Sequence, residues 1–197
     1  MSVFEWAGRN AFRYRSYTPV PFLVLAVLFA RPSAAGLLAG FLAMCLGEAM
    51  RLWSVSVAGP ETRTTRVLAG SELVTEGPYA HTRNPIYIGN MFIYGGVALM
   101  SMGLFPWLLI GGMLWFALQY RMIVSFEEEF LERRFGETYR SYRNSVSRFL
   151  PRFQGADAKL RVPELRRGFR SDRRTLQAEV AVTMLLVVLY IVRSAGG

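Results

Sequence analysis

Cysteine, histidine and lysine are nearly absent from this sequence, and charged residues of any kind are scarce. Cys45 is the single cysteine and His81 the single histidine among 197 residues. One cysteine excludes an internal disulfide, and one cysteine with one histidine cannot supply the ligands of a zinc cluster. Charged residues make up 19% of the chain, below the ~25% of an average soluble domain, whereas apolar residues make up 52%. The composition therefore favours a membrane protein and argues against a metal centre.

Long uncharged segments predict several membrane-spanning helices, because a helix needs about 20 apolar residues to cross the bilayer core. The candidate segments are residues 16–30, 32–60, 84–120 and 176–192. Residues 84–120 suffice for two spans, and Gly103 and Pro106 in their middle indicate the connection of a helical hairpin. We therefore predict an all-α polytopic membrane protein with about five spans, in which spans 3 and 4 form this hairpin.

The positive charge is unevenly distributed. Net charge is +9, and with five spans 19 of the 23 basic residues lie on one side, in the N-terminal tail, residues 61–83 and residues 126–175. The positive-inside rule then places the N-terminus, which we expect to be retained, and both long loops in the cytoplasm of an inner-membrane protein. This distribution explains the basic pI without a nucleic-acid partner. The arginine-rich residues 161–174 fit a solvated topology signal or contact with anionic lipid.

Few ionisable residues interrupt the spans, and these are functional candidates because burying a charge in a membrane is costly. Glu48 and Arg51 lie three residues apart on the second span, so an internal ion pair is one interpretation. Arg121 and Glu128, seven residues apart, share a face if the fourth span continues beyond the membrane. Helix-forming residues support that continuation, and Gly136 stands where a helix would end.

A second polar site precedes the third span. Residues 77–79 read Gly-Pro-Tyr, which predicts a turn, and Asn84-Pro85 places proline in the first turn of a helix, where its missing N–H costs nothing. The free N–H groups of such a helix start suit a carboxylate or phosphate, and Arg83 adds a two-pronged donor.

An R-x-W string and two blocks stand out over about residues 40–151. These are Arg51-x-Trp53; Gly77-Pro78-Tyr79 with Arg83-Asn84-Pro85-x-Tyr87-x-Gly89; and Glu127-Glu128-x-x-Leu131, then Phe135-Gly136-x-x-Tyr139-x-x-Tyr142, ending in Arg148-Phe149-x-Pro151. Together they resemble the isoprenylcysteine carboxyl methyltransferases and the related membrane phospholipid methyltransferases. Asn84 stands where the family more often has histidine, so no role that needs an imidazole is carried over.

The resemblance implies a cytoplasmic pocket for S-adenosylmethionine and an opening towards the bilayer for a lipophilic methyl acceptor. Glu127 and Glu128 suit the cationic groups of the cofactor, and Arg83 with the helix N–H groups suits its carboxylate. Tyr87, Tyr139 and Tyr142 would stack on adenine or bind the ribose, unless they form an interfacial aromatic belt. The cofactor-binding candidates are Gly77, Pro78, Tyr79, His81, Arg83, Asn84, Pro85, Tyr87, Glu127, Glu128, Tyr139 and Tyr142.

The acceptor determines which residues would be catalytic. A carboxylate acceptor is already nucleophilic, and Arg51, Arg121 or Arg148 could hold it. An amine acceptor needs a base, for which Glu48 or one of the glutamates at 127–129 is the candidate. The R-x-W and R-F-x-P strings are more similar to the carboxyl methyltransferases, so O-methylation of an isoprenylcysteine-like substrate is our first expectation.

Three alternatives stay open: a phospholipid N-methyltransferase, a membrane sterol reductase that uses NADPH, and a non-catalytic membrane protein. In every case we predict one membrane-embedded domain over residues 1–197. It comprises the motif core, a basic interfacial segment at 152–175 and an additional span at 176–193, to which the resemblance assigns no function. The oligomeric state is open.

Overall fold

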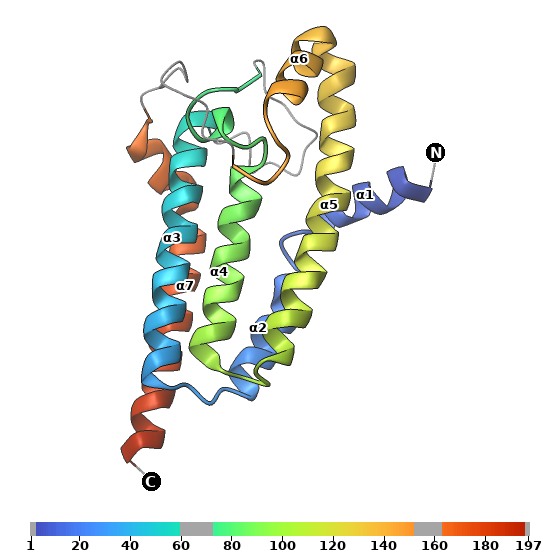
Figure 1. Cartoon of the computed structure of the whole chain (residues 1–197). Helices are drawn as coiled ribbons and strands as arrows, with labels where there is room; N and C mark the ends of the chain where they lie inside the picture. The colour runs from blue at the N-terminus through green and yellow to red at the C-terminus, as the bar shows by residue number, and fades with distance from the viewer. Residues whose placement is uncertain (1–2, 60–72, 152–162, 196–197) are drawn as a thin grey trace. The chain divides into compact units, whose positions relative to one another are not determined.

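The computed structural model describes residues 3–59, 73–151 and 163–195, and every regular element within these ranges is helical (Figure 1). The predicted all-α class is thereby confirmed. The elements are, in chain order, α1 (Val3–Tyr14), α2 (Pro19–Leu28), α3 (Ala34–Ala58), the short 3-10 helix η2 (Gly77–Ala80), α4 (Pro85–Ser101), α5 (Trp107–Phe135), α6 (Glu137–Ser145) and α7 (Leu165–Ala195).

Within the described ranges, three helices are long and apolar enough to cross a membrane: α3, α5 and α7. Helix α4 has 17 residues and α2 only ten, which correspond to about 25 Å and 15 Å of helix. The bilayer core is about 30 Å thick. The protein is therefore a polytopic membrane protein, but the first predicted span, residues 16–30, contains a helix that is only about half the length needed.

The predicted hairpin is confirmed, since five residues, 102–106, connect α4 to α5. Helix α5 also continues to Phe135 as predicted, and Gly136 follows at φ +52°, a conformation that favours glycine. Helix α7 differs from the expectation because it begins at Leu165, so the basic residues and the last span form one helix. Helix α1 was not predicted. Residues 60–72 of the first long loop and 152–162 of the basic segment lie outside the described residues.

The chain divides into two compact units that share helices. The first comprises Met1–Arg13, Ala49–Ile88 and Gln119–Asp172, and the second comprises Tyr14–Glu48, Gly89–Leu118 and Arg173–Gly197. Helices α3, α4, α5 and α7 contribute residues to both units. The motif residues from 77 to 87 and from 127 to 151 all belong to the first unit.

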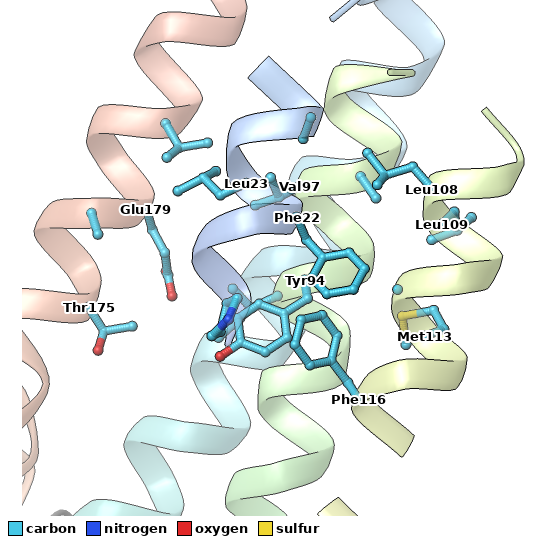
Figure 2. A pocket seen from close by; sticks show the side chains of 17 residues that line it. Phe22, Leu23, Tyr94, Val97, Leu108, Leu109, Met113, Phe116, Thr175 and Glu179 are labelled. Atoms are coloured by element: carbon cyan, nitrogen blue, oxygen red, sulfur yellow. The ribbon is translucent and has the colours of Figure 1, made fainter. Parts of the chain in front are cut away.

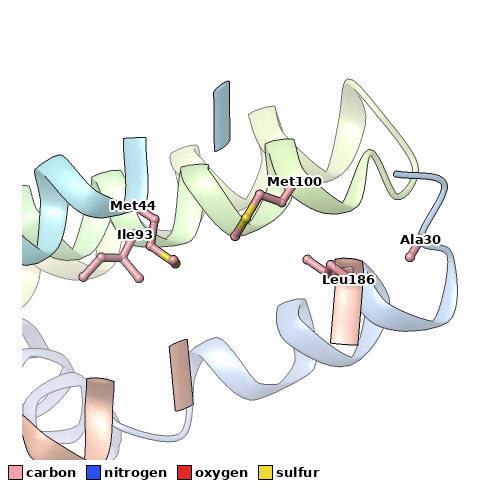
Figure 3. Packing of buried hydrophobic residues seen from close by; sticks show 5 residues of the cluster. All are labelled: Ala30, Met44, Ile93, Met100 and Leu186. Carbon is pink, nitrogen blue, oxygen red and sulfur yellow. The ribbon is translucent and has the colours of Figure 1, made fainter. Parts of the chain in front are cut away.

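In the second unit, α3 and α4 approach each other through glycines. A Cβ atom placed on Gly40 would lie 2.4 Å from the carbonyl oxygen of Gly96, and one on Gly47 would lie 2.5 Å from that of Gly89. Small residues commonly allow such close approach between membrane helices. A buried apolar cluster lies beside this contact (Figure 3) and consists of Ala30, Met44, Ile93, Met100 and Leu186. Helix α7 thus packs on the hairpin through Leu186.

In the first unit, α1 packs against α5, and α3 is linked to α7. A Cβ on Gly8 would lie 2.9 Å from the Cβ of Phe126, whose ring also contacts that of Phe12. The guanidinium of Arg51 donates to Asp172 at 2.6 Å, with both side chains buried. A buried ion pair needs good geometry to offset its desolvation, and removing one partner strands the other charge. This pair therefore fixes the start of α7 against α3.

The glycine contact predicts a sharp difference between two conservative substitutions. Gly40→Ala introduces a methyl group where no space exists, and we expect it to lower the free energy of unfolding by about 1–3 kcal/mol, the usual cost of overpacking. Gly111→Ala on α5 is the control, because a Cβ there meets nothing within 4 Å and alanine is the better helix former. Thermal unfolding in detergent measures both. A Gly40→Ala protein as stable as Gly111→Ala would contradict the close contact.

Candidate functional site

Glu128 is the centre of the polar cluster in the first unit. It lies on α5 with only 6% of its surface exposed. Its Oε1 accepts hydrogen bonds from Nε and Nη2 of Arg83, at 2.9 and 2.8 Å, and its Oε2 accepts one from Nη2 of Arg148. Hydrogen bonds between charged partners are about twice as strong as neutral ones. One buried carboxylate therefore joins the loop before α4 to the segment after α6.

The backbones of these two segments also pair directly. The N–H of Arg83 donates to the carbonyl of Ser147 at 3.0 Å. The Arg148 carbonyl accepts from the side-chain amide of Asn84 at 3.0 Å and from the Thr82 hydroxyl at 3.2 Å. Pro85 then starts α4, as the sequence predicts. Asn84 thus acts through its amide donor, a contact that spacing alone did not indicate.

Arg83 is nearly saturated by partners within the protein. Besides its two bonds to Glu128, its Nη1 donates to the carbonyl of Arg143 at 2.9 Å and to that of Val146. Four of its five N–H donors therefore have protein partners. Arg83 therefore positions Glu128 and the end of α6, a role that the sequence pattern did not indicate.

Three tyrosines, Tyr79, Tyr139 and Tyr142, lie close to one another in the first unit. The Tyr142 hydroxyl donates to the carbonyl of Tyr79 at 2.7 Å, and Tyr139 is buried beside it, with ring centroids 6.1 Å apart. Burial, together with the neighbouring Tyr139, raises the pKa of Tyr142 above its usual value. Burial likewise raises the pKa of Tyr79 and Tyr139. All three phenols therefore keep their protons at neutral pH and remain hydrogen-bond donors.

The 3-10 helix η2 presents Tyr79. Gly77 begins it at φ +60°, and a Cβ there would lie 3.1 Å from Val57 of α3. Both the conformation and the close approach favour glycine at this position. Pro78 is buried, and its carbonyl accepts a hydrogen bond from the backbone N–H of His81. His81 itself is only partly buried. The Gly-Pro-Tyr string thus positions the tyrosine carbonyl that Tyr142 contacts.

Glu127 has a setting different from that of Glu128. Its carboxylate accepts a hydrogen bond from the Tyr87 hydroxyl at 2.9 Å, and the Tyr87 ring packs on that of Tyr120 at 4.6 Å between centroids. Tyr120 is buried, whereas Glu127 and Tyr87 are partly accessible. The two neighbouring glutamates therefore divide into one enclosed by arginines and one at an accessible, aromatic surface.

The four candidate catalytic residues have different surroundings. Arg148 lies in the cluster, bonded to Glu128 and Ser125, with its side chain 35% exposed. Arg51 is in the same unit but is buried against Asp172. Arg121 is exposed, whereas Glu128, seven residues later on α5, is buried. Glu48 is buried and belongs to the second unit.

Sequence reasoning missed three contributors: Asp172, Ser125 and Tyr120. Asp172 is the one acidic residue between Arg166 and Arg174. A single carboxylate among so many arginines could have indicated a buried ion pair. Tyr120 precedes Glu127 by seven residues, so helical spacing would have placed both on one face. Ser125 carried no signal, because its role depends on where Arg148 lies.

Comparison with known proteins gives one family match. The phospholipid methyltransferase family matches residues 35–138, more than half of the chain. This range contains the Gly-Pro-Tyr loop and both glutamates, whereas Tyr139, Tyr142, Arg148 and the whole of α7 follow it. No solved structure matches the chain.

Three curated proteins are similar to it over shorter stretches. The protein-S-isoprenylcysteine O-methyltransferase of Schizosaccharomyces pombe is 34% identical over 118 residues, which cover 57% of this chain and 47% of that protein. The nickel-cobalt-cadmium resistance protein NccN of Alcaligenes xylosoxydans xylosoxydans is 31% identical over 121 residues, 61% of this chain and 52% of that protein. The cobalt-zinc-cadmium resistance protein CzcN of Cupriavidus metallidurans is 31% identical over 114 residues, with 57% and 48% covered.

The chain spans about half the length of these relatives. The family match, in contrast, includes the loop before α4, the hairpin and the paired glutamates in the order that the sequence resemblance predicted. That resemblance is therefore confirmed, and the chain belongs to the phospholipid methyltransferase family.

Proposed function

We propose that this protein transfers a methyl group from S-adenosylmethionine to a lipidic acceptor at the cytoplasmic face of an inner membrane. The observation that carries the proposal is the contact of Glu128 with both Arg83 and Arg148. It joins the two sequence blocks by which the chain resembles membrane methyltransferases. The excess of basic residues in the loops next to this cluster supports the cytoplasmic orientation.

The residues present fit the cofactor's charges. S-adenosylmethionine is a sulfonium that also carries an ammonium, a carboxylate and an adenine. Glu127, which is partly accessible and lies next to Tyr87, suits the cationic groups. The charge of Glu128 is instead balanced by two arginines, whose side chains it positions. The cofactor's carboxylate suits the first backbone N–H groups of α4, which begins at Pro85. Tyr87, which is partly accessible and is backed by the buried Tyr120, offers a ring face for a planar group.

The cofactor supplies an electrophilic methyl group, whose in-line transfer disperses charge. The chain's own residues then have to align the acceptor and exclude water. A carboxylate acceptor needs no base, and Arg148 would orient it, which makes O-methylation of an isoprenylcysteine-like acid our first choice. An amine acceptor must lose a proton, which Glu127 would accept; N-methylation of a phospholipid is the second choice because the family match carries that name.

Two relatives are named for resistance to metal ions. Among the residues that the structure describes, no three His, Cys, Asp or Glu side chains gather in a group that could hold a metal ion. Metal binding is therefore not part of the proposal.

The affinity for the cofactor should depend on Glu127 but not on the nearby Glu129. Titration calorimetry of the purified protein should show saturable binding of S-adenosylmethionine and S-adenosylhomocysteine but not of NADPH. Glu127→Gln removes the charge that meets the cationic group, so we expect affinity for S-adenosylmethionine to fall by about 1.5–3 kcal/mol. Glu129→Gln, on the exposed side of α5 and paired with Arg133, should leave it unchanged. Binding of NADPH alone would support the reductase alternative, and equal effects of both variants would contradict the role of Glu127.

The acceptor class is tested by the chemistry of the product. With cofactor labelled in its methyl group, an amine-blocked S-farnesylcysteine should yield a labelled ester that releases methanol in alkali. Phosphatidylethanolamine vesicles, assayed in parallel, should give no alkali-stable label. Arg148→Lys keeps the charge but loses the planar fork, so we expect methyl-ester formation to fall roughly 10-fold or more. Label on the phospholipid amine instead would overturn O-methylation in favour of N-methylation.

A further inference from the structure

The second unit contains a cavity that the proposed methyl transfer does not use. Its volume is about 160 Å³, and helices α2, α4, α5 and α7 line it (Figure 2). Most of the wall is aliphatic or aromatic: the Phe116 ring lies 5.1 Å from that of Phe22 and 4.5 Å from that of Tyr94. All lining residues belong to the second unit, so the cavity is a property of that unit alone.

Polar groups lie along one side of this cavity. Glu179 and Thr175 border it from α7, and Figure 2 shows their side chains on the side opposite Met113, Leu108 and Leu109. Glu179 is only 8% exposed although it lies in the apolar part of α7. An ionisable side chain within a membrane-spanning helix is costly and usually serves a function. The cavity therefore has an apolar part and a carboxyl corner.

We propose that this cavity binds a membrane lipid with a single apolar chain and a hydrogen-bond-donating end, an alcohol or an amine. The donor would bind at the Glu179 and Thr175 corner, and the chain would lie against Phe22 and Phe116. A volume of about 160 Å³ resembles that of an engineered apolar cavity that binds one benzene, about 150 Å³. This size suits part of one chain and excludes two acyl chains side by side.

The carboxyl corner distinguishes this ligand from a carboxylate acceptor. Glu179 accepts a hydrogen bond from an alcohol or an ammonium, whereas its ionised form repels a second carboxylate. The ligand is thus chemically different from the isoprenylcysteine-like acid proposed above. All of α7 lies beyond the family match, which ends at residue 138, so the carboxyl corner belongs to a part of the chain that the match does not cover.

Two adjacent glycines on α5 provide a matched pair of variants. Gly112 lines the cavity, and a Cβ there would lie 3.5 Å from the Phe22 ring, an ordinary contact. Gly112→Leu would therefore extend its branched end into the cavity without a backbone clash. Gly111 has open space around it, so Gly111→Leu adds the same side chain outside. Both replace glycine at neighbouring positions of one helix, which equalises their effect on helix propensity.

The experiment is photolabelling of the full-length protein in nanodiscs with a hexadecanol derivative that carries a diazirine near the end of its chain. Peptide mass spectrometry should locate the label on α2 and α5, and unlabelled hexadecanol and hexadecylamine should compete. Hexadecyl methyl ether, which has no donor, should compete at least about tenfold less well. Gly112→Leu should lower labelling about tenfold, and Gly111→Leu should not. Glu179→Gln should weaken competition by the amine more than by the alcohol.

Three results would overturn the proposal. Equal competition by the ether would show a purely apolar cavity with no role for the carboxyl corner. Equal labelling of the two leucine variants would place the probe outside the cavity. Unchanged competition by the amine in Glu179→Gln would remove Glu179 from the site. Circular dichroism and thermal unfolding of each variant ensure that a lost label reflects the site and not the fold. None of these readouts depends on S-adenosylmethionine, so they stand apart from the test of methyl transfer.

Discussion

The site depends on one buried carboxylate that two arginines share. Glu128 binds Arg83 from the loop before α4 and Arg148 from the segment after α6. Without it, two guanidinium groups would face each other next to a low-dielectric interior, where like charges repel strongly. With it, the loop and the segment also pair through the backbone contacts of Arg83 and Asn84. Glu127, one residue earlier, is thereby left at an accessible surface beside Tyr87.

The second unit follows a different physical rule. Its helices approach through backbone atoms at Gly40 and Gly96, because in a membrane, close van der Waals packing replaces the hydrophobic effect as the source of helix association. Such packing tolerates no added methyl group, yet α2, α4, α5 and α7 leave a cavity with Glu179 on its wall. The chain therefore combines a tight α3–α4 contact with a ligand-sized space that is bordered by α4 and α5, which lie within the family match, and by α2 and α7, which lie outside it.

Patterns in the sequence predicted the local features well. Uncharged runs indicated α3 and the α4–α5 hairpin, and the glycine at 136 marked the end of α5. The motif strings indicated which segments matter, because each is a local pattern. Long-range pairs were beyond this reasoning: Arg51 meets Asp172, 121 residues away, where spacing had suggested Glu48. Arg121 and Glu128 share a helical period, but only the surrounding helices decide which side chain is buried. Likewise, the sequence pattern did not indicate that Arg83 binds Glu128.

The central claim, that Glu128 holds the two motif segments together, is tested most directly by amide hydrogen exchange in the absence of any ligand. Glu128→Gln keeps the shape of the side chain and removes the charge that both arginines share. The account predicts faster exchange in residues 77–88 and 137–149 together, with α3 and α4 near Gly40 and Gly96 still protected. Glu129→Gln should exchange as the unsubstituted protein does. Unchanged exchange of both segments in Glu128→Gln would contradict the account.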